Sequence, residues 1–392
     1  MIGGLQRRLA DLACRALLAT LPASLRSWGL AIRYETAGID DDTNALLFAL
    51  DSIRGLIPHA LASLLFHPFA SLIGNSALLS EGSCFIDFYD GLMRRPRALG
   101  IACAIGAVTL GLAYMAIADA PVRYLGINTG ALAIGLTLLA LLGRFIPAGR
   151  RWVSGAILTM AGVLLVTALL GDSVDGVTRW VSLGGLAIQP SLILLPFMLA
   201  AFARCRSMLT TAGMITTAIA MAIQPDRAMA GTLTVGLAVF AVMRHDKHVL
   251  AAFGASLIGF ATTLVRADTL PAARYVDHIL SSSFDVHPSA GAAALGGSIL
   301  LLVPGIIGWR RDPANRDTYA VFGAVWLTAL MAATLGNYPT PIVGYGGSAI
   351  IGYALSLLAL PKLVSAQAKA TTRISATAYT PPIDRHLLVG LA

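Results

Sequence analysis

The sequence predicts an all-α protein whose helices cross a membrane about ten times. Of its 392 residues, 57% are hydrophobic and only 12% are charged. A mean hydropathy of +0.76 is too high for an ordinary soluble domain. From about residue 95 onward, apolar runs long enough to cross a bilayer as helices follow one another. Together these observations predict a polytopic helical membrane protein.

Ten spans are predicted within a membrane domain of residues 95–362. Each is an apolar run bounded by charged residues, glycine or proline. The predicted spans are 98–118, 126–144, 152–170, 190–204, 208–223, 229–243, 248–266, 291–309, 318–335 and 344–361. The tail 363–392 is rich in Ala, Thr and Pro without apolar periodicity, so we expect it to be disordered.

Residues 1–90 predict a separate, cytoplasmic and membrane-associated helical module. Asp11 and Arg15 interrupt the apolar core that a signal peptide would need within Met1–Leu21. That segment instead has the period of an amphipathic helix. Its predicted apolar face consists of Leu5, Leu9, Leu12 and Ala16.

Two more helices are predicted in this module. One lies around Leu25–Arg33, and another spans Thr43–Arg54 with the aspartates of Asp40–Asp42 as its cap. The apolar segment Leu56–Ile73 contains two prolines and two histidines. We therefore interpret it as interfacial or packed, not as a span.

The basic residues predict the orientation of the spans. Loops on one side are rich in arginine and lysine, and the tail lies on that side. The opposite loops carry only Arg123, Arg179, Arg227, Arg266 and Arg274. The positive-inside rule then places both termini in the cytoplasm. It also explains the net charge of +8 without a nucleic-acid partner. The four cysteines have no metal-ligand spacing, so we expect free thiols and assign no metal site.

Four short motifs lie on the predicted exterior side. Arg179 and Trp180 stand in a loop between two spans, and Gln189–Ser191 begins the next span. Gln224–Asp226 lies at a later turn, and Gly344–Ser348 opens the last span. Each has an ordinary explanation as an interfacial anchor, a helix end or a close-packing site. The glycines of the last motif predict that bulk at Gly346 or Gly347 would displace the last span.

In their order, these motifs resemble those of the SEDS family, the FtsW/RodA/SpoVE proteins of cell-wall synthesis. The resemblance covers about residues 95–362. It rests on Gly176–Val181 with Gln189–Ser191, on Gln224–Asp226, and on Asn337 followed by Pro341 and Gly344–Ser348. It implies ten spans in the inner membrane of a bacterium. The chain departs from the family pattern at Leu192, where the family has Glu. It also lacks the Lys that the family has one turn later, and its exterior loops are shorter.

The resemblance implies polymerisation of lipid II, an undecaprenyl-linked disaccharide-pentapeptide. An exterior carboxylate would be the general base, and cations or a divalent ion such as Mg²⁺ would bind the pyrophosphate. We identify Asp277 as the candidate base and Asp285 as the alternative, although either could be a solvated loop residue. Asp317 is predicted inside, as the cap of the ninth span.

The resemblance also implies a set of substrate-binding residues. For the arginines among them, anchoring to lipid headgroups is an equally good explanation. The set is Arg179, Trp180, Gln189, Ser191, Gln224, Asp226, Arg227, Arg274, Tyr345 and Ser348.

Three functions remain open at this point. The first is a lipid II glycosyltransferase with a class B penicillin-binding protein as its partner. The second is a catalytically silent SEDS homologue that binds partners, for example through residues 1–90. The third is a flippase for lipid-linked precursors, which would need charged residues deep within the spans. Leu192 and the missing Lys argue against a strongly charged cavity.

Overall fold

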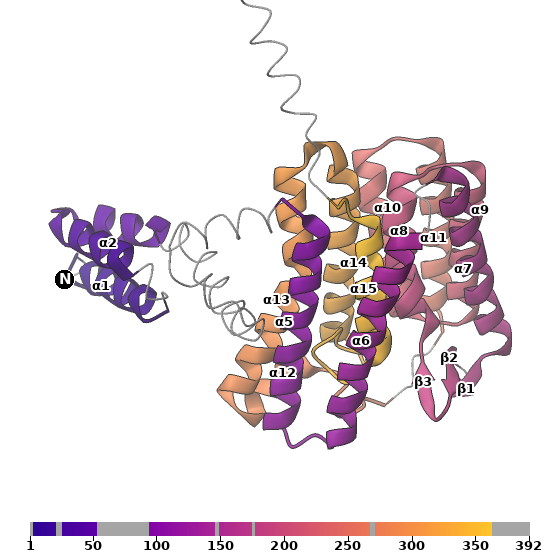
Figure 1. Ribbon diagram of the computed structural model, residues 1–392, viewed down its shortest axis with the longest axis horizontal. Helices are drawn as coiled ribbons and strands as arrows, with labels where there is room; N and C mark the ends of the chain where they lie inside the picture. Colours follow the sequence, from indigo (N-terminus) through magenta and orange to yellow (C-terminus); the bar gives the residue numbers. More distant parts are fainter. Residues whose placement is uncertain are drawn as a thin grey trace, which may run out of the picture. The chain divides into compact units, whose positions relative to one another are not determined.

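The computed structural model describes residues 3–20, 26–52, 94–145, 149–174, 177–266 and 271–362. The chain divides into two compact units, Met1–Met93 and Arg94–Ala392. Both are helical where they are described (Figure 1). The predicted segment 56–73 and the predicted tail 363–392 lie outside the described residues.

The first unit contains α1 (Gly3–Thr20), α2 (Arg26–Gly38) and a helical segment at 42–52. The predicted aspartate cap is confirmed, because Asp41 Oδ1 accepts hydrogen bonds from the backbone N–H groups of Thr43 and Asn44 at 2.7 and 2.9 Å. These bonds lower the pKa of the Asp41 carboxyl. Three helices therefore form near the predicted positions.

The apolar face predicted for the first helix is wrong in part. Leu9 and Leu12 are 45% and 67% exposed, whereas Ala10 and Cys14 are buried against Ala49. Small side chains allow the helices to approach closely. Arg7 also donates to the carbonyls of Ala37 and Ile39 at the C-terminal end of α2, which joins the two helices.

The described residues of the second unit form ten apolar helices at the predicted places. Six of the described helices are long and apolar enough to cross a membrane, and four are shorter. Their bounds are α5 Pro96–Ile117, α6 Val122–Phe145, α7 Arg150–Leu170, α8 Pro190–Arg204, α9 Met208–Ile223, α10 Arg227–Met243, α11 Lys247–Leu264, α13 Pro288–Arg311, α14 Arg316–Leu335 and α15 Gly347–Ser356, which the short 3₁₀ helix η4 Leu357–Ala359 extends.

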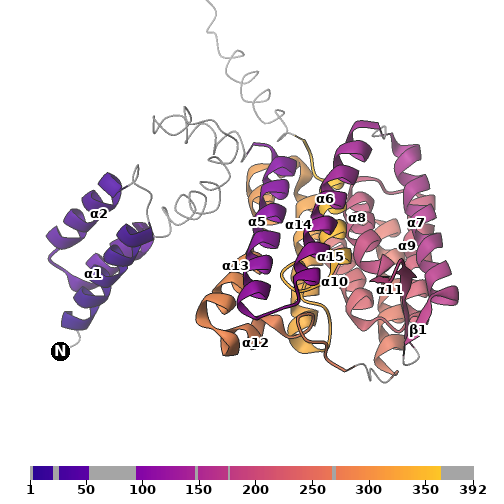
Figure 2. The same ribbon diagram turned by 60° about the horizontal axis from the view of Figure 1, so that its bottom comes forward.

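The connections between these helices gather at two ends of the bundle. We call one the basic end; its described connections are 94–95, 205–207, 244–246, 312–315 and 360–362. The other, the motif end, holds the described parts of 118–121, 171–189, 224–226, 265–278 and 336–346. The predicted alternation of the loops is thus confirmed. Figure 2 shows the helices running between the two ends.

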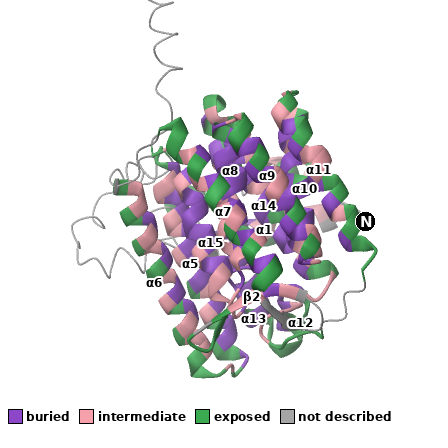
Figure 3. Cartoon of the chain, turned by 90° about the vertical axis from the view of Figure 1, so that its right-hand side faces the viewer, coloured by how far each residue is buried: buried purple, intermediate pink, exposed green. Residues whose placement is uncertain are grey.

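Helix α15 lies inside the bundle and packs against both α6 and α8 (Figures 1 and 2). Trp326 of α14 and Tyr353 of α15 are fully buried, with ring centroids 5.0 Å apart. Purple ribbon marks the buried faces of the helices in Figure 3, and green marks the exposed ones. Many exposed positions carry large apolar side chains, as expected where helices face lipid.

Close packing of the last span depends most on Gly352, outside the predicted pair, and also on Gly347 within it. A Cβ at Gly352 would lie 2.0 Å from the Leu192 carbonyl oxygen of α8, so only glycine fits there. A Cβ at Gly347 would meet Ala131 at 3.0 Å, and one at Gly346 would meet nothing within 4 Å. The packing argument for Gly346 is therefore wrong.

The long loop before α8 contains a small antiparallel sheet that the sequence analysis did not predict. Its strands are β1 (Asp172–Val174), β2 (Val177–Leu183) and β3 (Leu186–Ile188), in the order β1-β2-β3. Gly184 and Gly185 form the two-residue turn between β2 and β3, both with positive φ. A short helix, α12 (Ile279–Val286), was likewise not predicted.

Candidate functional site

The carboxylate of Asp226 is the centre of a buried polar cluster at the motif end. Its Oδ2 accepts hydrogen bonds from Gln189 Nε2 at 2.8 Å and from Ser191 Oγ at 3.2 Å. Its Oδ1 accepts from the Met229 N–H at 3.2 Å and lies 3.8 Å from Arg179 Nη1. Asp226 is fully buried, so its charge depends on these partners.

Local sequence explains how these side chains are positioned. Asp226 is the N-cap of α10, and Gln189 is the N-cap of α8 with Pro190 as the first helical residue. The Gln189 N–H donates to Ser348 Oγ at 3.0 Å, in the first turn of α15. All four sequence motifs therefore have a member in this cluster or in direct contact with it.

Arg179 enters the cluster from β2. Its guanidinium lies 4.4 Å from the ring centroid of Trp180 and 5.9 Å from that of Tyr338. The side chain is almost fully buried, yet its Nε has no hydrogen-bond partner among the described residues. One donor of this cation is thus left for another acceptor.

The cavity over this cluster is very small. It is lined by Arg179, Gln189, Asp226, Tyr338 and Pro339, among others, and holds about 10 Å³. That volume is about enough for one water molecule. The cluster is closed as it stands.

Asp277 lies at the same end, in the connection between α11 and α12. Its Oδ2 accepts from the Ala273 N–H at 2.8 Å, and its backbone forms an isolated β-bridge with Pro339, beside the Arg179 cluster. Burial raises the pKa of this half-buried carboxyl, although the Ala273 hydrogen bond and the charges of His278 and Arg179 oppose the rise. Asp277 is therefore a carboxylate near Arg179 whose affinity for a proton is increased.

His278 and Asn337 support the segment around Asp277. His278 Nε2 is 2.8 Å from Asn337 Oδ1, and the Thr340 N–H donates to the Val276 carbonyl at 2.8 Å. Sequence analysis singled out Asn337 but missed His278. Its position next to Asp277 was the available signal.

Asp285, the alternative base, is in a different environment. It lies on α12 and is exposed to solvent, whereas Asp277 is half-buried. The two acids therefore differ in burial, and Asp277 is the one whose backbone pairs with Pro339 beside the Arg179 cluster.

The three arginines considered for pyrophosphate binding do not converge. Arg227 Nε donates to the Thr263 carbonyl at 3.0 Å, and its Nη2 donates to the Arg266 carbonyl, so it caps the C-terminal end of α11. Arg274 is exposed and stacks on Tyr275, with 4.8 Å between guanidinium and ring centroid. Of the three, Arg179 alone belongs to the cluster.

Gln224 and Tyr345 also point elsewhere. Gln224 Nε2 donates to the Leu164 carbonyl of α7 at 3.0 Å. Tyr345 stacks on Tyr124 with ring centroids 4.0 Å apart, and Tyr275 packs edge-on against the same Tyr124 ring. These residues join helices and loops around the cluster without contacting Asp226.

Asn128 is a residue that the sequence analysis missed. Its Nδ2 donates to the Gly344 carbonyl at 2.8 Å, and its Oδ1 accepts from the Gly346 N–H at 3.1 Å. It thereby fixes the turn that brings Ser348 to Gln189. The signal was a lone asparagine in an apolar helix, where a polar side chain needs a partner.

Asp317 lies at the basic end, as predicted, but the prediction that it caps the ninth span is wrong. Asn315 is the N-cap of α14, and Asp317 is within the first turn. Its carboxylate pairs with Arg244 at 2.6 Å. A basic neighbour at the end of α10 offers a stronger partner than the helix's own N–H groups.

The described residues do not form a metal-binding group. None of their His, Cys, Asp and Glu side chains gather in threes that could hold an ion. Asp226 is already engaged by Arg179, Gln189 and Ser191.

Ten apolar helices in the described part of the chain, with a buried polar cluster at one end, define a polytopic α-helical membrane protein. Its fold is similar to that of the rod shape determining protein RodA of Thermus thermophilus, in native and mutant form. The sequence identity is 22% over 68% of this chain and 95% of RodA, with a TM-score of 0.47.

A chain in a peptidoglycan synthase complex described as coordinating polymerization and crosslinking is similar at 20% identity. There the match covers 66% of this chain and 96% of the other, with a TM-score of 0.45. No family model and no curated protein sequence matches this chain.

Proposed function

We propose that this protein is a divergent SEDS-like protein of peptidoglycan synthesis in a bacterial inner membrane, with both termini in the cytoplasm. The observation that carries the proposal is the convergence of the motifs. Arg179, Gln189, Ser191 and Asp226 come from three separate segments and contact one another, and Ser348 joins Gln189 from a fourth. Motifs that served only as local helix ends would have no reason to meet.

The proposed reaction is glycosyl transfer between lipid II molecules, with Asp277 as the general base. The carboxylate takes the proton from the 4-hydroxyl of the acceptor sugar as that oxygen attacks the anomeric carbon of the donor. The bond from that carbon to the pyrophosphate breaks, and undecaprenyl pyrophosphate leaves. The increased proton affinity of Asp277 supports this role, because a base works best when its pKa is nearer the operating pH.

Arg179 is the proposed donor to the leaving pyrophosphate. Its free Nε and its position near Asp277 support this role. A cavity of about 10 Å³ does not admit a phosphate group. The proposal therefore requires Tyr338 and Pro339, which line the cavity, to move when substrate binds.

A catalytically silent, partner-binding homologue is the second candidate. The closed cluster favours it, since Asp226 is fully engaged within the protein and no room is left beside Arg179. A class B penicillin-binding protein is the proposed partner under either candidate, from the family resemblance. A flippase has less support, because Arg179 and Asp226 lie at one end of the bundle and not midway along the spans.

Purified lipid II distinguishes the two candidates. The full-length protein is incubated with lipid II alone and with candidate penicillin-binding proteins, and glycan polymer is measured. Polymer that depends on Asp277 supports the enzyme. The silent homologue is supported if no arm of the experiment yields polymer. It also requires that the Asp277→Asn variant rescue the phenotype of a deletion strain as well as the native protein does.

A further inference from the structure

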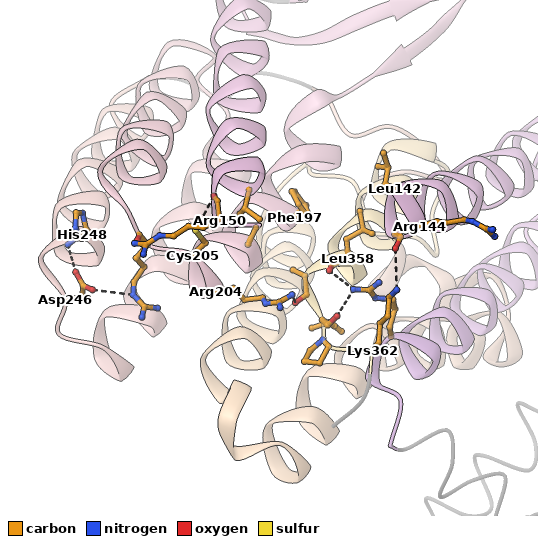
Figure 4. A pocket seen from close by; sticks show the side chains of 18 residues that line it. Leu142, Arg144, Arg150, Phe197, Arg204, Cys205, Asp246, His248, Leu358 and Lys362 are labelled. Carbon is orange, nitrogen blue, oxygen red and sulfur yellow. Dashed lines mark hydrogen bonds and ion pairs between the residues drawn. The ribbon is translucent and has the colours of Figure 1, made fainter. Parts of the chain in front are cut away.

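A large cavity lies at the basic end, opposite the Asp226 cluster. It has a volume of about 980 Å³ and is formed by the ends of α6 and α8, the start of α7 and the segment after α15 (Figure 4). Six cationic residues line it, with Asp246 as the only carboxylate among the lining residues described. The cations are Arg97, Arg144, Arg150, Arg204, Arg206 and Lys362.

Most of these cations are held by backbone carbonyls. Arg97 Nη2 donates to the carbonyls of Leu358 and Leu360 at 2.8 and 2.9 Å, and Arg204 Nη1 donates to that of Ala359 at 3.1 Å. The simplest explanation is that they cap helix ends. Carbonyls carry only partial charge, however, so capping does not neutralise a group of cations that share one cavity.

Within the described part of the chain, five of these six cations have no ion pair. Among the described residues, Arg206 is the one of these six cations with an ion pair, to Asp246 at 3.3 Å. The Nε of Arg97 is buried without a hydrogen-bond partner in the same described part of the chain. In Figure 4 the Arg204 side chain extends toward Leu358, whereas Arg144 points away. Such a cavity concentrates anions.

The walls of the cavity are not uniformly polar. Apolar residues of α6, α7, α8 and η4 also line it: Leu142, Val153, Phe197, Ala201 and Leu358. The cavity lies where apolar helices end, which is the level of lipid headgroups in a bilayer. Basic pockets between membrane helices at this level suit anionic headgroups.

We propose that this cavity binds a phosphate-bearing anion at the basic end of the bundle, either the headgroup of an anionic phospholipid or a soluble phosphate compound. Arg97, Arg150 and Arg204 are the proposed phosphate donors, and the apolar wall would accommodate the first part of an acyl chain. This site is separate from the Asp226 cluster and does not depend on its activity.

Binding is tested on the full-length protein purified in a neutral detergent. Three probes are titrated: dioleoyl phosphatidylglycerol, dioleoyl phosphatidylcholine and inorganic pyrophosphate. Bound lipid is counted by native mass spectrometry, and pyrophosphate binding is measured by calorimetry. The variant Arg204→Gln, which removes one of the proposed donors, should bind the preferred probe at least about tenfold more weakly, as loss of charge-assisted hydrogen bonds would cause.

Two further variants keep the test independent of folding. Arg150 is exposed and donates to a single carbonyl, so Arg150→Gln should fold and still weaken binding. Arg310→Gln is the matched control, because it removes an exposed charge at the same end outside the cavity. It should bind like the native protein.

The outcomes separate the two sources of phosphate. Retention of phosphatidylglycerol but not phosphatidylcholine, without competition from pyrophosphate, identifies a lipid site. Tight binding of pyrophosphate with no preference between the lipids identifies a soluble anion. Equal retention of both lipids with no pyrophosphate binding, or equal weakening by Arg310→Gln and the cavity variants, overturns the proposal.

Discussion

Gln189 Nε2 donates a 2.8 Å hydrogen bond to the buried carboxylate of Asp226, joining the start of α8 to the start of α10. Arg179 approaches the other oxygen of the same carboxylate at 3.8 Å. Arg179 and Asp226 are both buried, so water does not solvate their charges. Each charge is therefore stabilised by the other. The architecture of the motif end therefore depends on one carboxylate.

Asp226→Asn should destabilise the protein strongly. The substitution leaves the buried Arg179 without its counter-charge, and breaking a buried ion pair from one side costs about 3–5 kcal/mol. The thermal unfolding midpoint in detergent measures the effect. Asp285→Asn, at an exposed position of the same end, should leave the midpoint unchanged. An Asp226→Asn midpoint equal to that of the native protein would show that the pair contributes no stability.

Much of the fold could be predicted because a bilayer imposes long apolar helices. The ten helices lie within a few residues of their predicted places. The hairpin at Gly184–Gly185 was missed, although Thr178–Leu183 is rich in β-forming residues and the paired glycines are a hairpin signal. Its position between two spans made a plain loop the simpler prediction.

The site was harder to predict because a sequence does not show which of several possible hydrogen-bond partners a side chain will bind in the fold. The motif order indicated that Arg179 and Asp226 share an end, and they do meet. Arg227 has the same charge and lies next to Asp226, yet the carbonyls at the end of α11 bind its guanidinium. Asn128 is far from every motif in sequence and was overlooked for that reason.

Gly352→Ala should destabilise the packing of α15 on α8. The added Cβ would lie 2.0 Å from the Leu192 carbonyl, which forces the helices apart. Overpacking of this kind costs about 1–3 kcal/mol. Gly346→Ala is the control, since its Cβ would meet nothing within 4 Å. Thermal unfolding of the two variants compares them, and equal midpoints would refute the assigned contact.

Reporter fusions test the orientation of the two ends. Fusions after Arg206, Lys247 and Arg316 lie at the basic end and should report cytoplasm, and a fusion after Arg151 should do the same. Fusions near Ser173, Ala228 and Ser282 should report the exterior. The alternation of arginine-rich loops is the physical reason. An exterior signal at Arg316 would reverse the orientation and place Asp317 on the side of the proposed chemistry.

Asp277→Asn should keep the protein folded but reduce lipid II polymerisation by about 10²–10⁴-fold, the usual contribution of a general base. Asparagine keeps the shape of the side chain and cannot take a proton. Asp285→Asn is the control and should retain activity. Loss of polymerisation in Asp285→Asn alone would show that Asp285, and not Asp277, is the base. Undiminished polymerisation in both variants would show that neither acid is the base.

The pH dependence gives a second readout of the same residue. Because burial raises the pKa of Asp277, its folded state binds a proton more tightly than its unfolded state does. The stability that this proton contributes is present at low pH and is lost as the pH rises through the folded pKa. Catalysis needs the deprotonated form, so polymerisation should fall as the pH drops through that value, which lies above the ordinary carboxyl value of about 3.9. A rate that stays constant down to pH values near about 4 would show that no carboxyl with a raised pKa acts as the base.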